Sequence, residues 1–188
     1  MKQNIIAVAL SALCLVACAQ DPNTISLNPK VNAHANKVYD DLNAKISVYD
    51  LRSTAHIVEV LSADRPSTLI SSADSLKDVL NSEFSDQLAL QGLKLNNGSD
   101  LQVQFQVERA RTYVNQDVLD YRANTIIKLR VKVENPAQTL SKTFTLRATT
   151  RGALSADIDE LQKDFNVQLA KLIIQVVEDE QLQQFIKG

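Results

Sequence analysis

Cys18 ends an apolar run near the start of the chain, and its thiol is the most distinctive reactive group in the sequence. The run extends from Ile5 to Val16, and the residues at 15–18 read LVAC. A cysteine in this position is a buried core residue, a redox-active thiol or the point at which the chain is attached to a membrane. Lys2 precedes the run, and about a dozen apolar residues after a positive charge are typical of a signal peptide. The run is too short to span a bilayer, which needs roughly 20 helical residues, so this segment is predicted to be a targeting signal.

Leu15, Val16 and Ala17 before Cys18 resemble the lipobox of bacterial lipoproteins. This resemblance implies that residues 1–17 are a signal peptide that is cleaved off. It also implies a covalent S-diacylglycerol on the Cys18 thiol and an N-acyl chain on the new amino group, and we expect no other cofactor. Each buried methylene contributes about 0.8 kcal/mol, so three chains should hold the protein on a leaflet without a transmembrane helix. The alternative is a buried cysteine in an uncleaved helix. It does not explain why a positive residue, an apolar run of signal-peptide length and a lipobox-like sequence occur together.

Ala19 follows the predicted lipidated cysteine. The resemblance to bacterial lipoproteins implies a sorting rule in which Asp at this position favours retention in the inner membrane. Because Ala stands there, we predict the periplasmic leaflet of the outer membrane, with the membrane itself as the first partner. The other cysteine, Cys14, lies in the removed segment, so the mature chain has no pair of cysteines for a disulfide.

The rest of the sequence carries little that could perform catalysis. The formal net charge is −2, and there is no global basic excess of the kind that indicates nucleic-acid binding. His34 and His56 are isolated, with no cysteine or carboxylate at ligand spacing, so we predict no metal site. The sequence contains no G-x-S-x-G, no glycine-rich phosphate loop and no H-E-x-x-H motif. We therefore predict that the protein is not an enzyme.

Three regions in the second half of the chain alternate between apolar and polar residues. They are residues 101–108, 121–133 and 140–151. Alternation of this length predicts strands with one buried and one solvated face. The connections between them are short, which predicts an antiparallel meander.

Helical spacing appears on both sides of these strands. After Pro66, apolar residues share one face through Leu88, with a capping-box pattern at Ser71 and Asp74 and a stop at Gly92. A longer apolar stripe predicts a second helix from Ala156 to Val177.

These elements predict a single α+β domain over residues 44–188. Two apolar segments at 45–52 and 55–62 predict a pair of strands, and a short extra strand is possible after Gly92. The predicted fold is a two-layer antiparallel sheet in the order ββαβββα, with two helices covering one face. Residues 18–43 are polar and contain two prolines, and we predict a lipidated N-terminus followed by a flexible tether.

If the strands pair in this way, one face of the sheet is basic. The outward positions would be Arg122, Lys128, Arg130, Lys132, Arg147 and Arg151, with threonines between them and Gln102, Gln104 and Gln106 on the flank. Such a face suits an anionic glycolipid, an acidic glycan or an acidic envelope protein. The alternative is a sheet face that is polar only because it meets water.

Arg109 and Arg111 interrupt the alternation, because they stand where apolar residues are due. Either a β-bulge shifts the buried face at this point, or the hairpin projects beyond the helices and both of its faces are solvated.

Taken together, four stretches resemble the YajG family of uncharacterised bacterial lipoproteins. They are LVAC at 15–18, SADSLKDVLNSEFSDQLALQGLKL at 72–95, the hairpin segments LQVQFQVERARTYV at 101–114 and YRANTIIKLRVKV at 121–133, and QQFIKG at 183–188. The resemblance implies an outer-membrane lipoprotein without established activity, and only Cys18 is carried over as a functional residue. Two functions remain open, a non-enzymatic binding or adaptor module of the envelope and a glycolipid or glycan binder that uses the basic face.

Overall fold

Three long strands form the framework of the molecule. The computed structural model describes residues 24–34, 36–40, 42–62 and 65–188. Within them, β6 (Gln102–Gln116), β7 (Asp120–Glu134) and β8 (Thr139–Ala153) pair antiparallel in sequence order. The predicted meander is confirmed, and so is the α+β class.

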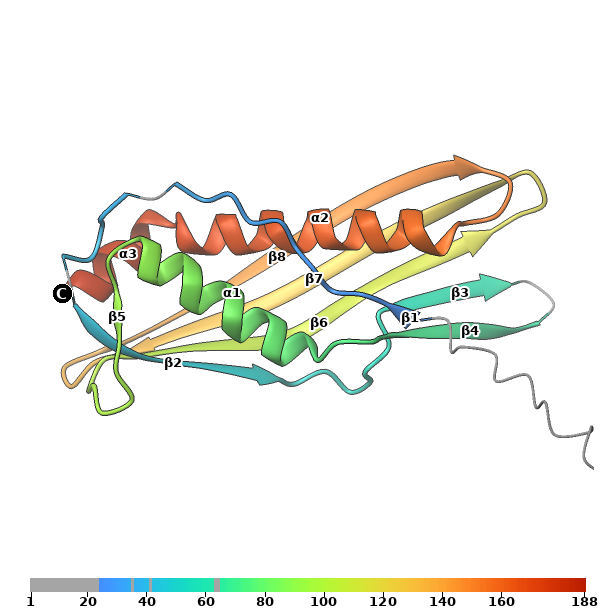
Figure 1. Ribbon diagram of the computed structural model, residues 1–188. Coiled ribbons are helices and arrows are strands. Elements are labelled where there is room, and N and C mark those ends of the chain that lie inside the picture. Colours follow the sequence, from blue (N-terminus) through green and yellow to red (C-terminus); the bar gives the residue numbers. More distant parts are fainter. Residues whose placement is uncertain (1–23, 35, 41, 63–64) are drawn as a thin grey trace, which may run out of the picture.

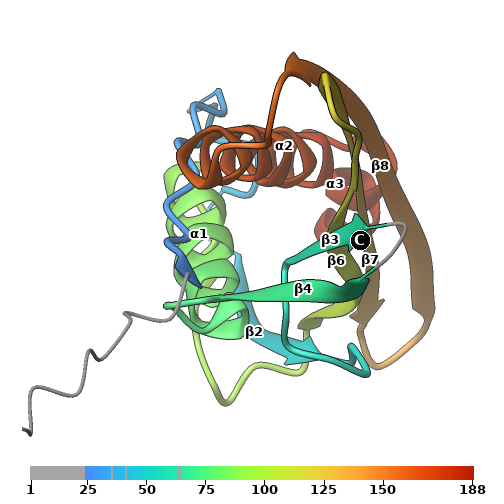
Figure 2. The ribbon, with the colours of Figure 1, turned by 90° about the vertical axis from the view of Figure 1, so that its right-hand side faces the viewer.

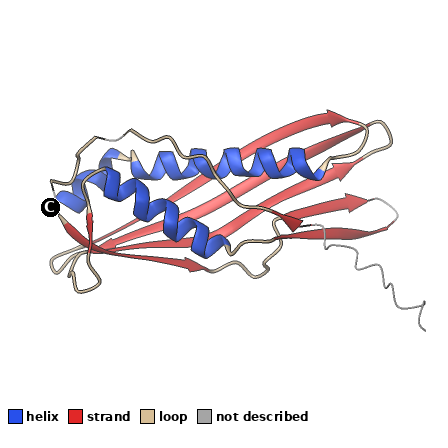
Figure 3. Ribbon diagram, viewed as in Figure 1, coloured by secondary structure: helices blue, strands red, loops and turns tan. Residues whose placement is uncertain are grey.

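The helices pack on one face of this sheet, which gives the two predicted layers (Figures 1, 2 and 3). The helices are α1 (Leu76–Leu90), α2 (Ile158–Val177) and α3 (Glu180–Lys187). In α2 the buried side chains are Leu161, Phe165, Leu169, Ala170, Leu172, Ile173, Val176 and Val177. Across the interface, Phe84 of α1 stacks on Phe105 of β6 with ring centroids 3.8 Å apart. The predicted helix at 156–177 is therefore confirmed, whereas α3 was not predicted.

The sheet is mixed, which corrects the prediction that all strands are antiparallel. Strands β2 (Asn43–Asp50) and β3 (Val58–Ser62) lie one after the other along the same edge of β6, and both run parallel to it. They do not pair with each other. The chain returns from them to β6 through a crossover that contains α1, and a crossover of this length allows parallel pairing.

Three short or exposed strands complete the sheet. Strand β4 (Arg65–Ser72) forms an antiparallel hairpin with β3, β5 (Lys94–Leu95) pairs with β2 as the possible extra strand after Gly92, and β1 (Thr24–Ile25) pairs with β4. Only Ile70 of β4 is buried. The predicted order ββαβββα is thus present, with β1, β4, β5 and α3 added to it.

The N-cap of helix α1 lies four residues later than the predicted cap. Ser75 is the N-cap residue, and its hydroxyl accepts a hydrogen bond from the Asp78 N–H at 3.3 Å. The predicted cap at Ser71 and Asp74 is wrong because Ser71 belongs to β4 and pairs with Thr24 of β1. The predicted stop is confirmed, since Gly92 follows the helix with a φ of +93°, a backbone conformation that suits glycine.

A β-bulge in β6 explains the two arginines that interrupt the alternation. The register with β7 shifts between Val107 and Arg109, which leaves Glu108 as the extra residue. Before the bulge the buried side chains are Val103, Phe105 and Val107, and after it they are Ala110, Thr112 and Val114. Of the two alternatives, the bulge is therefore the one that the structure contains.

The described part of the predicted tether packs against the domain. We call residues 24–34 the N-terminal strap. Ile25 is fully buried, and the Ser26 N–H donates to Gln162 of α2 at 2.6 Å. Further along the strap, the Asn28 N–H donates to Asn166, and His34 contacts Glu178. The strap thus follows α2 along its length (Figure 1).

The burial of Ile25 gives a direct test of the strap. We expect Ile25→Ala to lower the free energy of unfolding by about 2–4 kcal/mol, because it removes apolar side-chain volume from the core. Thr24→Ala is the control, because Thr24 is exposed. Equilibrium denaturation in urea measures both, and equal stabilities for the two variants would mean that the strap does not pack as described.

Candidate binding surface

The six basic residues predicted to form a binding face all point away from the helices. Arg122, Lys128, Arg130 and Lys132 alternate along β7 with residues buried beneath the helices. Arg147 and Arg151 occupy the matching positions of β8, opposite Ile126 and Arg122. We call the outward side chains of β6, β7 and β8 the outer face. The structure therefore brings the predicted residues together on one surface.

Two glutamates form ion pairs with three of these six cations. The Glu108 carboxylate lies 2.7 Å from the Lys128 ammonium and also pairs with Arg130. The Glu134 carboxylate lies 2.7 Å from the Lys132 ammonium. The hydrogen bond from Lys128, together with the charges of Arg130 and Lys128, lowers the pKa of Glu108 below its ordinary value. These three cations thus already have partners within the protein.

The other three cations have no ion pair within the described residues. Arg122, Arg147 and Arg151 are exposed, and none forms an ion pair with another residue that the structure describes. The register sets Arg122 directly opposite Arg151. Like charges opposite each other on neighbouring strands destabilise a sheet, so this arrangement is not explained by the stability of the fold.

A shallow hollow beside these arginines is too small for a typical ligand pocket. It has a volume of about 250 Å³, and Asp117 and Asp120 line it together with Arg122 and Arg151. Pockets for small molecules usually begin at roughly 300 Å³ and are mostly apolar. The outer face is therefore better suited to an extended partner than to an enclosed small molecule.

Strand β8 offers a second means of binding, because its far edge carries no strand among the described residues. It pairs only with β7 along its 15 residues. The opposite side of the sheet ends in the two-residue strands β1 and β5. Lys142 points inward from β8 and binds Asp179 at 2.7 Å, and inward charges of this kind discourage edge pairing. The half of β8 that contains Arg147 and Arg151 has no inward-pointing charged residue of this kind.

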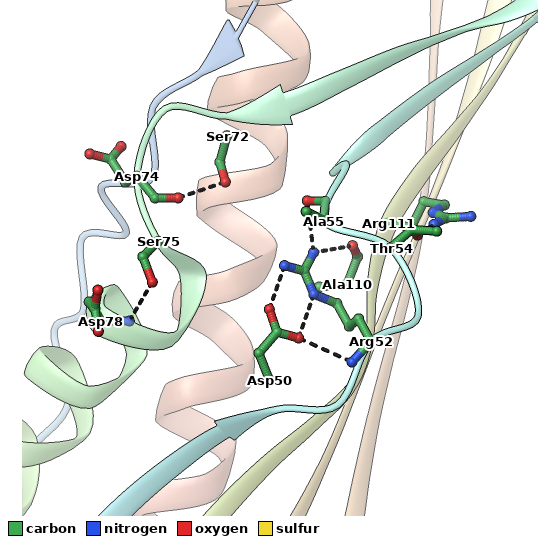
Figure 4. Close-up of polar contacts among 10 residues, drawn as sticks. All are labelled: Asp50, Arg52, Thr54, Ala55, Ser72, Asp74, Ser75, Asp78, Ala110 and Arg111. Carbon is green, nitrogen blue, oxygen red and sulfur yellow. Dashed lines mark hydrogen bonds and ion pairs between the residues drawn. The ribbon is translucent and has the colours of Figure 1, made fainter.

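An arginine cluster fixes the loop between β2 and β3 over the bulge (Figure 4). The Arg52 side chain is only 7% exposed and binds both oxygens of Asp50, at 2.7 and 2.9 Å. It also donates to the carbonyl oxygens of Ala55 and Ala110, both at 3.4 Å. Burial opposes the ionisation of Asp50, but the hydrogen bonds and charge of Arg52 outweigh it and lower the pKa of Asp50. Arg52 therefore joins β2, the loop and β6.

Neighbouring side chains extend this cluster toward β3. Arg111, just past the bulge, binds Glu59 at 3.3 Å and also contacts the Thr54 hydroxyl. His56 Nε2 lies 3.7 Å from the same glutamate. The two arginines that interrupt the alternation therefore differ. Arg109 is exposed, whereas Arg111 holds the loop between β2 and β3 in place.

The structure separates the remaining predicted residues. Cys18 lies outside the described residues. His34 and His56 are apart, each beside a glutamate. In the described ranges, no three His, Cys, Asp or Glu side chains gather where they could hold a metal ion.

The bulge and the Arg52 cluster were not recognised from the sequence as parts of one site. In the sequence, Glu108 looks like any other polar residue of an alternating strand. The bulge, however, places it between Lys128 and Arg130 of β7. The D-x-R spacing of Asp50 and Arg52 was the available signal for the second feature.

These features define a class of protein: an α+β domain with an open, partly basic sheet surface. None of its described helices is long and apolar enough to cross a membrane. Residues 29–187 match a protein family described as "Uncharacterized lipoprotein". The chain belongs to this family, the YajG family of uncharacterised lipoproteins, as the sequence predicted.

The chain is similar to solved structures at low sequence identity. Protein XCC0632 from Xanthomonas campestris has a TM-score of 0.61 and 16% identity, with 86% of this chain and 96% of that chain covered. Rare lipoprotein B from Shewanella oneidensis has a TM-score of 0.45 and 11% identity, with 76% and 98% covered. No curated protein matches the chain. At these identities the likeness to XCC0632 shows the fold alone.

The Arg52 cluster predicts a large effect on stability. We expect Arg52→Ala to lower the free energy of unfolding by about 1–3 kcal/mol, since it removes a buried guanidinium that hydrogen-bonds to Asp50 and to the carbonyl oxygens of Ala55 and Ala110. Arg109→Ala is the matched control, because that arginine lies beside the same bulge but is exposed. Denaturant unfolding compares the two, and a loss as small as that of the control would contradict the structural role.

Glu108 predicts an acid-dependent contribution to stability. Its pKa is lowered in the folded protein, so the ionised form stabilises the fold above the ordinary value of 4.5. This contribution is lost as the pH falls below 4.5 and through the lowered pKa. We expect Glu108→Gln to destabilise by less than about 1 kcal/mol at neutral pH, because the ion pair is partly exposed.

The difference between wild type and Glu108→Gln should therefore shrink toward zero in acid. Thermal unfolding between neutral pH and pH values below 4.5 measures it. Asp100→Asn, an exposed carboxylate outside these ion pairs, should show no such trend. A pH-independent difference for Glu108→Gln would disprove the charge-based explanation.

Proposed function

We propose that the mature protein is anchored by acyl chains on Cys18 to the periplasmic leaflet of the outer membrane and serves as a non-enzymatic binding module of the envelope. Its membership of a lipoprotein family supports the lipid anchor. The LVAC sequence and Ala19 support acylation and outer-membrane sorting. Because the anchor keeps the domain at a surface, its work is to bring another envelope component there.

The observation that carries this proposal is the free edge of β8 beside arginines that form no ion pair within the described residues. An extended partner segment can add as a strand to such an edge and gain main-chain hydrogen bonds. Arg147 and Arg151 point outward from the half of β8 that no inward charge guards. An acidic segment would satisfy these arginines and relieve the repulsion between Arg151 and Arg122. We therefore favour an acidic protein segment as the partner.

Anionic glycolipid binding is the second candidate. The observation in its favour is the direct opposition of Arg122 and Arg151 on the outer face, because two adjacent guanidinium groups suit a phosphate. This function uses the outward side chains and not the backbone edge of β8. The two candidates therefore differ in whether contacts are centred on the β8 edge.

Photo-crosslinking in intact cells tests the proposal. A photo-reactive amino acid replaces Thr145, which is exposed on β8 and leaves every arginine in place, while Asn81, exposed on α1, is the control position. We expect a protein crosslink at Thr145 that Arg147→Glu with Arg151→Glu reduces by roughly tenfold, because acidic partners avoid the reversed charges. Asn81 should give no such product.

The alternative outcomes are distinct. Charge-sensitive capture of lipopolysaccharide at Thr145 would support the second candidate and overturn the first. Equal products at Thr145 and Asn81 would overturn both. Mass spectrometry of the mature protein in the same cells tests the anchor separately, because an unmodified N-terminus would contradict acylation of Cys18.

A further inference from the structure

Three large apolar side chains are exposed together at one end of the long strands. Val118 and Leu119, in the turn between β6 and β7, are 85% and 77% exposed, and Leu154, directly after β8, is 66% exposed. The Leu154 N–H donates to the Leu119 carbonyl oxygen at 2.8 Å, so the two segments lie side by side. We call Val118, Leu119 and Leu154 the apolar tip.

Hydrogen bonds hold the apolar tip in a defined shape. The Gln116 side-chain amide donates to the carbonyl oxygens of Asp117 and Leu154, at 2.9 and 2.8 Å. Its oxygen accepts from the Ala156 N–H at 3.0 Å. One glutamine thus ties the turn to the segment that leads from β8 into α2.

Leu154 is an unfavourable residue for its backbone conformation. Its φ is +62°, in the left-handed region where a non-glycine residue is uncommon. The strain is not compensated by burial, because the side chain is mostly exposed. An exposed leucine at a strained position contributes little to folding, and strained positions of this kind gather at functional sites.

The strands project beyond the helices at this end (Figure 1). A strand of 15 residues spans about 50 Å, whereas the 20 residues of α2 span about 30 Å. No helix therefore covers the apolar tip. Tyr121, the first inward residue of β7 after the turn, already contacts Glu160 at the start of α2, with 2.9 Å between the oxygens.

The described chain begins close to the same turn of α2. Ser26 binds Gln162, two residues from the Glu160 that Tyr121 contacts. Five residues lie between Cys18 and Thr24, and the six steps of chain from one to the other reach at most roughly 20 Å. A lipid on Cys18 therefore keeps this end of the molecule next to the membrane surface.

Charges of both signs surround the apolar tip. Arg122, Arg151, Asp117 and Asp120 line one hollow beside it, and Glu160 of α2 lies with Arg151 around a neighbouring one. With no excess of positive charge around it, the apolar protrusion favours the interface of a phospholipid bilayer through burial of its side chains and not through attraction to anionic headgroups.

We propose that the apolar tip inserts into the interfacial region of the phospholipid leaflet that carries the lipid anchor. This inference rests on the proposed acylation of Cys18. The domain then has two attachments to the membrane, the acyl chains and the apolar tip, and its orientation on the surface is fixed. Insertion is an intramolecular step once the anchor is in place, so a small protein surface is sufficient.

A fluorescent label at Leu119 tests the insertion. Cys14 is removed with the signal peptide and Cys18 is acylated, so Leu119→Cys introduces a unique free thiol for an environment-sensitive NBD dye. The purified lipidated protein is reconstituted into phosphatidylcholine vesicles. Leu95→Cys is the matched control, because Leu95 is 50% exposed and lies in β5, toward the opposite end of the molecule (Figure 1).

We expect a blue shift at position 119 and a loss of roughly half of its fluorescence with brominated lipid tails, as for a side chain at the headgroup–acyl boundary. Position 95 should show neither. Adding phosphatidylglycerol should not strengthen the insertion, because the surroundings of the tip carry no excess of positive charge. A further variant carries the label at Leu154→Cys together with the substitutions Val118→Ser and Leu119→Ser. These two serines should abolish the quenching while leaving the melting temperature unchanged.

Failure of the anchor and failure of the insertion are distinguishable. Protein that does not float with the vesicles would contradict acylation. Protein that floats but shows equal, unquenched fluorescence at positions 119 and 95 would overturn the insertion. A blue shift at 119 without quenching by brominated lipid would mean that protein, such as a second copy, covers the apolar tip, which also overturns it.

Discussion

Burial of the inner face of β6, β7 and β8 beneath α1 and α2 is the interaction on which the rest of the structure depends. It requires apolar residues at alternate positions over strands of 15 residues. The bulge at Glu108 keeps this burial intact, because it moves the inward positions of β6 from odd to even numbers. The same extra residue brings a carboxylate between Lys128 and Arg130. Packing of the core and the charge of the outer face are therefore set by one local feature.

How far the sequence predicted this fold depended on the length of each pattern. The alternation over 121–133 and the stripe over 156–177 are long, and both elements were predicted. Strand β4 was missed because it buries only Ile70, which leaves no period to detect. The N-terminal strap was missed because Ile25 and Leu27 stand alone in a polar segment. The parallel pairing of β2 and β3 with β6 joins segments that are more than 50 residues apart in the sequence. A local pattern of apolar and polar residues does not show which distant strand will be its partner.

The candidate site was predictable to a similar degree. Alternation placed all six basic residues on one face, and the structure agrees. Which of them have an ion pair depends in part on the register, since the bulge brings Glu108 of β6 to Lys128 and Arg130 of β7. Reading charge along one strand could show the pair of Glu134 and Lys132, which lie two residues apart on β7, but not the pairs of Glu108. With one face of the sheet covered by helices, the outer face and the edge of β8 are the surfaces left for a partner, and the fold shared with XCC0632 does not by itself specify which.

The N-terminal strap has a mechanical consequence. Tension applied through acyl chains on Cys18 would enter the domain at β1, where only two residues pair with β4. Peeling such a short strand breaks its hydrogen bonds one after another, so this joint would yield before the long strands are loaded. Detachment of the eleven residues 24–34 would then add roughly 35 Å of chain. If Cys18 is acylated, the strap would thus supply extra chain length, and the domain could follow a receding partner without unfolding its sheet.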